Sequence, residues 1–195
     1  MYDYYKEARN LSWKTLLDCG ISSLPINLSA IANHYNFKIV TFSDSAIIQL
    51  FRDDVLKGDG FIVALNEEKH IFINDHINDR NRRRFTLAHE IGHGVLRHDI
   101  GEIHYRNSEM DSETNIQEIQ ANVFARDILM PATVLAALNI HTADEIMKVC
   151  HISRKSAEIR AVRMKELYER NMFNLHPLEK ETRELFNDFI INYQK

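Results

Sequence analysis

The order of the expected elements along the chain predicts an α+β fold. Helical patterns come first, β-rich runs cluster between residues 36 and 73, and the chain from residue 115 onward has helical spacing throughout. Strands that are gathered in one region, rather than alternating regularly with helices, are typical of α+β architecture. A chain of 195 residues with 45% apolar and 27% charged side chains is expected to bury a real hydrophobic core.

The first part of the chain is expected to build a small sheet between helices. Apolar spacing and β-rich composition predict helices over 2–17 and 28–35, a strand over 36–40, a short helix within 43–54, and strands over 60–64 and 70–73. The turn sequence Asn66-Glu67-Glu68 between the last two strands indicates a hairpin.

The next helix carries the pattern His89-Glu90-Ile91-Gly92-His93 within the stretch RFTLAHEIGHGVLRH. Residues four apart share one helix face, so both imidazoles can reach a single metal ion. Glu90 lies one step round the helix, where it can act on a metal-bound water as a general base without being a ligand. The spacing therefore predicts a zinc site of the catalytic kind, and Gly92 indicates that another element approaches closely.

A catalytic zinc site needs a third protein ligand and an open water position. His98 is five residues past His93 and cannot join it unless the helix breaks. The helix expected over 115–130 offers Glu118, which shares a face with small residues that would allow tight packing against Gly92. Glu113 is an alternative ligand at the edge of the same face. Asn122, one turn after Glu118, is expected to orient a ligand.

The remainder of the chain is expected to be helical. Pro131 ends the preceding helix, and the later helices are predicted over 131–138, 143–150, 154–170 and 178–193. The segment from Ala143 to Leu167 has the pattern of a helix-turn-helix, with Ser153 as N-cap of the second helix. Four basic residues on that helix are candidates for contact with DNA: Arg154, Lys155, Arg160 and Arg163.

Two stretches of this sequence resemble the paired motifs of the ImmA/IrrE family of metallo-endopeptidases. They are FTLAHEIGH and EIQANVFARDILMP, and the resemblance covers roughly residues 1–170. It implies a zincin-like core of the gluzincin type over residues 1–139, followed by a helical region with a helix-turn-helix-like segment over 140–195 that packs on the core. It also implies one Zn²⁺ per chain held by His89, His93 and Glu118, with Glu90 as base. The substrate that it implies is a helix-turn-helix repressor of a mobile element or stress response.

Two further parts of a peptidase site are expected on weaker signals. The strand formed by His70, Ile71, Phe72 and Ile73 precedes the metal-binding helix, and we expect it to be an edge strand that pairs with extended substrate. Tyr105, in the loop after that helix, is the first candidate donor to the oxyanion, with His104 and His98 as alternatives. The basic run of Arg80, Arg82, Arg83 and Arg84 would either be solvated or receive an acidic partner or DNA.

Composition limits the other classes of function. A net charge of −4 argues against a protein that coats nucleic acid. No apolar run is long enough for a membrane span, and two distant cysteines do not indicate a disulfide framework, so a cytoplasmic protein is expected. Two alternatives remain open: a DNA-binding regulator with a structural or vestigial zinc site, and a toxin or stress factor that acts through a partner.

Overall fold

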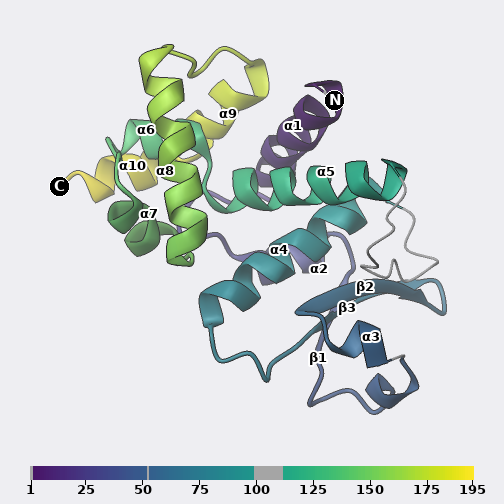
Figure 1. The fold of residues 1–195 in the computed structure, drawn as a ribbon. Helices are drawn as coiled ribbons and strands as arrows, with labels where there is room; N and C mark the ends of the chain where they lie inside the picture. Colours follow the sequence, from purple (N-terminus) through teal and green to yellow (C-terminus); the bar gives the residue numbers. More distant parts are fainter. Residues whose placement is uncertain (1, 52, 99–111) are drawn as a thin grey trace. The chain divides into compact units, whose positions relative to one another are not determined.

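The computed structural model describes residues 2–51, 53–98 and 112–195 (Figure 1). The first half of the described chain contains helices α1 (Tyr2–Asp18) and α2 (Leu28–His34), strand β1 (Lys38–Thr41), the 3-10 turn η1 (Ile48–Leu50), helix α3 (Asp53–Leu56), strands β2 (Gly60–Leu65) and β3 (Glu68–Ile73), and helix α4 (Arg80–Leu96). The second half contains helices α5 (Ser112–Leu129), α6 (Ala132–Ala137), α7 (Ala143–Cys150), α8 (Arg154–Glu169), α9 (Pro177–Leu185) and α10 (Asn187–Tyr193). The α+β prediction is confirmed.

The chain divides into two compact units. The first consists of Met1–Ala8 and Leu28–Ala125, and the second of Arg9–Asn27 and Arg126–Lys195. The first unit holds the sheet and the candidate metal site, whereas the described elements of the second are helical. The boundary that the sequence suggests at residue 139 stays a prediction.

The sheet of the first unit has three strands in the order β1-β3-β2. Strands β2 and β3 form the predicted hairpin, with Phe61 opposite Phe72, while β1 runs parallel to β3 with Lys38 opposite His70. The middle strand therefore has hydrogen-bonded neighbours on both sides. The expectation that His70–Ile73 forms an edge strand for substrate is wrong, because its main-chain groups already pair within the sheet.

Strands β2 and β3 carry buried apolar residues on both faces of the sheet, whereas β1 is partly exposed. Phe61, Val63 and Phe72 belong to an apolar cluster with Phe42 and Val55 on one face. Ile62 alternates with them along β2 and reaches the other face, where α4 lies against β2 and β3. The sheet thus gives α4 a rigid support.

Two glycines let α4 fit between the sheet and α5 (Figure 1). A Cβ atom on Gly94 would lie 2.7 Å from Cζ of Phe37 and 2.9 Å from Cδ1 of Ile62 on β2. On the other side, a Cβ on Gly92 would lie 3.0 Å from Cδ1 of Phe124 and 3.4 Å from Cα of Ala121, both on α5. The absence of side chains at these positions brings both layers close to α4.

Successive helices α7 and α8 in the second unit pack against each other and are joined by residues 151–153. The predicted N-cap is confirmed, since the Ser153 side chain accepts a hydrogen bond from the main-chain nitrogen of Ser156. A capping box of Thr142 and Glu145 begins α7. The helix predicted over 178–193 is instead two helices that meet at the buried Phe186, whose φ of −89° and ψ of 4° depart from α-helical values.

Arg160 is not available to DNA, contrary to the sequence-based expectation. Its side chain is 2% exposed, and Nη1 donates to Oδ1 of Asp127 at 2.8 Å. Its other terminal nitrogen, Nη2, donates to the main-chain oxygen of Met130. Burial would raise the pKa of Asp127, but the charges of Arg126 and Arg160 outweigh it and hold the pKa below its usual range.

Replacing Asp127 with Asn is expected to destabilise the fold by about 3–5 kcal/mol, since it removes one partner of a buried pair. Denaturant unfolding at neutral pH measures this loss. The depressed pKa adds stability that is present above the unfolded value of about 4 and is lost as pH falls through the folded value. The gap between wild type and Asp127→Asn should therefore narrow in acid.

Asp144→Asn is the matched control, because its bond to Arg154 is also 2.8 Å long but both side chains are more than half exposed. A cost below about 1 kcal/mol is expected there. Equal losses for the two variants would contradict a special role for burial at Asp127.

Candidate metal centre

Helix α4 begins before the metal-binding motif and includes the basic run. The Asp79 side chain caps it by accepting hydrogen bonds from the main-chain nitrogens of Asn81 and Arg82. Two of the arginines have partners within the first unit. Arg82 forms a pair with Asp59 at 2.6 Å, and Arg83 donates to the main-chain oxygen of Asp75 at 3.1 Å.

His89 and His93 lie on one face of α4, and Glu118 of α5 lies opposite them. The two Nε2 atoms are 3.0 Å apart. The carboxylate bridges them, with Oε2 3.4 Å from Nε2 of His89 and Oε1 3.4 Å from Nε2 of His93. Each of these three residues offers one atom that can bind a metal, and the three atoms all lie within 4.8 Å of one another.

The donor set and its spacing fit a zinc ion. Zinc is held by imidazole nitrogen and carboxylate oxygen at about 2.0–2.2 Å in a tetrahedron. Two donors at such distances from a common centre lie about 3.3–3.6 Å apart in a tetrahedron, close to the separations of 3.0 and 3.4 Å found here. Three protein ligands leave the fourth position for water, which is the pattern of a catalytic rather than a structural site.

The other ring nitrogen of each histidine is also in contact. Nδ1 of His89 lies 3.1 Å from Oδ1 of Asn122, one helical turn after Glu118 on α5. Nδ1 of His93 lies 3.0 Å from Nδ1 of His98. Groups in these positions orient the imidazole and fix which nitrogen carries the proton.

His98 contacts the candidate ligand His93, which the sequence does not predict. A continuous helix would turn His98 away from His93, so the sequence predicts no place for it beside that ring. The helix instead ends at Leu96, and Arg97 adopts the left-handed conformation with φ of 58°. This reversal brings His98 back to the far side of the His93 ring. The apolar helical pattern ends at Leu96, and this was the feature of the sequence that indicated the end of the helix.

Burial and neighbouring imidazoles set the charges around the site. Burial and, to a lesser extent, the neighbouring His93 together lower the pKa of His98 to about 4. Burial would raise the pKa of Glu118, but hydrogen bonds and charge interactions with His89 and His93 hold it below the usual range for a carboxyl. A neutral imidazole and an ionised carboxylate are the forms that bind a metal.

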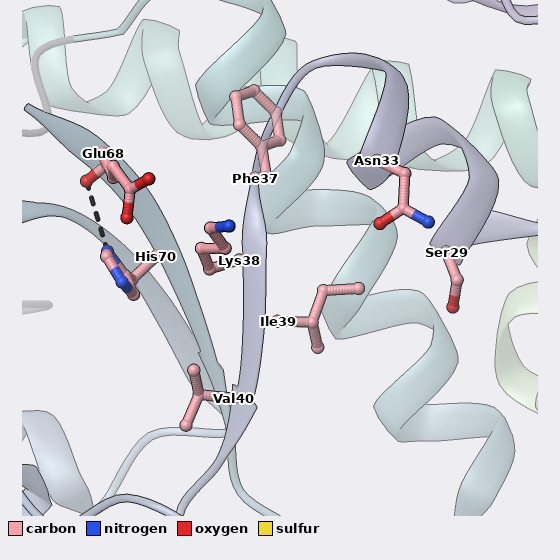
Figure 2. Close-up of a pocket in the computed structure, with 8 residues that line it drawn as sticks. All are labelled: Ser29, Asn33, Phe37, Lys38, Ile39, Val40, Glu68 and His70. Carbon is pink, nitrogen blue, oxygen red and sulfur yellow. Dashed lines mark hydrogen bonds between the residues drawn. The ribbon is translucent and has the colours of Figure 1, made fainter.

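The remaining site predictions fall in different places. Glu90 is buried at 8% exposure, next to His89 in the chain. Tyr105 and His104 lie outside the described residues. His70 lines an open pocket of about 550 Å³ beside β1 (Figure 2), whose lining includes none of the three candidate metal ligands.

Zinc affinity tests the assignment of Glu118 directly. Glu118→Gln removes the anionic ligand, so the zinc dissociation constant should rise by more than the roughly 10- to 100-fold typical of outer residues. Competition with a chromophoric chelator measures it. Glu113→Gln is the control, since Glu113 is the alternative ligand suggested by the sequence. A loss confined to the Glu113 variant would reverse the assignment.

Comparison with known proteins agrees with this geometry. The model of the IrrE N-terminal-like domain, a peptidase family, matches residues 44–162. The chain is also 35% identical over 80 residues to the Radiation response metalloprotease IrrE of Deinococcus radiodurans, a match that covers 38% of this chain and 24% of that protein. The match thus spans about a quarter of the relative's length. The chain belongs to the ImmA/IrrE family of metallopeptidases.

Proposed function

We propose that this protein is a zinc-dependent endopeptidase that cleaves a specific protein substrate. The observation that carries the proposal is the convergence of His89, His93 and Glu118, with their donor atoms spaced for one ion. The buried Glu90 beside them supplies a second carboxylate. Two imidazoles, one ligand carboxylate and one further carboxylate are what metal-assisted peptide hydrolysis requires.

His89, His93 and Glu118 would hold a zinc ion, which would supply the Lewis acidity that activates water and polarises the substrate carbonyl. Glu90 accepts a proton from the attacking water on its carboxylate and can then pass it to the leaving amine. His89, His93 and Glu118 would fix the position of the ion relative to Glu90. Asn122 holds the ring of His89 through Nδ1, so that Nε2 faces the site.

The proposed substrate is a helix-turn-helix repressor of a mobile element or stress response, acted on in the cytoplasm. Family resemblance is the support for this choice, together with a relative whose name describes a radiation response metalloprotease. Among the described residues, no helix has both the length and the apolar character to cross a bilayer. A specific substrate, rather than general proteolysis, is the central feature of this proposal.

Direct DNA binding by this chain has less support. Arg160 is buried against Asp127, and the exposed Arg154 pairs with Asp144. The outer surface of α8 also carries Ile159 and Val162, which are 57% and 64% exposed. Affinity for DNA phosphates depends on accessible cations. Of the other two predicted contacts, Arg163 pairs with Glu166, and Lys155 is exposed.

Glu90→Gln is expected to abolish cleavage and leave zinc binding intact, because the substitution removes the proton acceptor but no ligand. The assay incubates the purified protein with the repressor encoded by the neighbouring gene and follows fragments by mass spectrometry. The measured zinc content of the variant completes the test.

Glu118→Gln is the comparison that separates the two roles, since both activity and zinc should be lost. Full cleavage by Glu90→Gln would disprove the proposed base. Cleavage by neither the wild type nor a zinc-supplemented sample would reject the substrate and leave the metal site to be judged by affinity.

A further inference from the structure

A continuous line of hydrogen-bonding groups leads from the candidate metal ligand His93 to the surface. His98 Nδ1 lies 3.0 Å from His93 Nδ1, and His98 Nε2 lies 3.3 Å from Oε1 of Gln120. The amide nitrogen of Gln120 donates to Oε2 of Glu7 at 3.0 Å. His93, His98 and Gln120 are buried, whereas Glu7 on α1 is exposed. All four residues belong to the first unit.

The hydrogen bonds along this line can have only one assignment of donors and acceptors. A carboxylate can only accept hydrogen bonds, so Gln120 turns its NH₂ group to Glu7 and its carbonyl oxygen to His98. That oxygen accepts, and Nε2 of His98 must therefore carry a proton. A neutral imidazole has one N–H, which leaves Nδ1 of His98 as an acceptor.

The consequence reaches the metal ligand. Since Nδ1 of His98 accepts, Nδ1 of His93 must donate. The proton of neutral His93 then resides on Nδ1, and the lone pair is on Nε2, the atom that faces His89 and Glu118. This is the tautomer that can bind a metal through Nε2.

We propose that Glu7, Gln120 and His98 are positioning residues, which hold His93 in the tautomer and ring orientation that present Nε2 to the metal. The line ties three separate segments to one ligand: α1, α5 and the residues that follow α4. His89 obtains its orientation differently, from the contact of its Nδ1 with Asn122. The inference rests on the proposed metal site but not on peptidase activity.

The tautomers can be observed directly in the metal-free, full-length protein. Long-range ¹H–¹⁵N correlation spectra at neutral pH distinguish protonated from unprotonated ring nitrogens. We expect the Nδ1–H form for His93 and the Nε2–H form for His98. The opposite tautomer of His93 would overturn the proposal, whatever the activity of the enzyme.

Zinc affinity provides the second measurement. His98→Phe keeps a ring but removes both nitrogens, so it should weaken zinc binding by about 10- to 100-fold. His98→Asn can place an amide oxygen near the position of Nδ1 and should recover most of that loss. Circular dichroism checks that both variants are folded.

The relative zinc affinities of the two His98 variants distinguish a positioning role from a packing role. A packing role predicts that Phe, the larger side chain, is the better replacement, whereas positioning predicts that Asn is. Wild-type affinity in His98→Phe, or a larger loss in Asn than in Phe, would contradict the proposal. Neither readout involves peptide cleavage, so a failure of the proposed peptidase function would leave this result interpretable. If His98→Phe does not fold, the wild-type tautomers still decide the question.

Discussion

The close approach of α4 and α5 at Gly92 is the constraint on which the candidate site depends. Glu118 is on α5 and the histidines are on α4, so the carboxylate reaches both Nε2 atoms only if the helices nearly touch. Phe124 and Ala121 occupy the space that a side chain at residue 92 would need. On its opposite side, α4 is fixed against the sheet, where Gly94 admits Phe37 and Ile62. The position of the three candidate ligands is thus set by the packing of α4 and α5.

Orientation of the imidazoles adds a second level of organisation. Each histidine has its Nδ1 atom against a different side chain, Asn122 for His89 and His98 for His93. A ring that is held at one nitrogen offers the other in a fixed direction, which lowers the entropic cost of binding an ion. The two supports differ in origin, because Asn122 comes from α5 and His98 from the turn that ends α4.

Local periodicity explains why much of the site could be predicted from the sequence. His89 and His93 are one helical turn apart, and Glu118 and Asn122 have the same spacing on the partner helix. Because all four residues lie on regular helices, their spacing predicts which of them share a face. The position of His98 could not be predicted, because it depends on a single left-handed residue, Arg97, at which the helix ends. The order of the strands in the sheet could not be predicted either. Alternation reveals a strand, but not that β1 pairs in parallel with β3 and makes it the middle strand.

The second unit shows the same limit for charge. Counting basic residues on α8 suggested a surface for DNA, yet Arg160 neutralises the buried Asp127. Side-chain type does not reveal which cation has a buried counter-charge elsewhere in the chain. Only the packing of α8 against the end of α5 makes that clear.

X-ray absorption at the zinc edge, recorded on the zinc-loaded protein, identifies the atoms that hold the ion. We expect only nitrogen and oxygen donors at about 2.0–2.1 Å, with outer-shell scattering from two imidazole rings. A sulfur donor at about 2.3 Å, from Cys19 or Cys150, would contradict it. So would a spectrum with one imidazole, because His89 and His93 would then not share the ion.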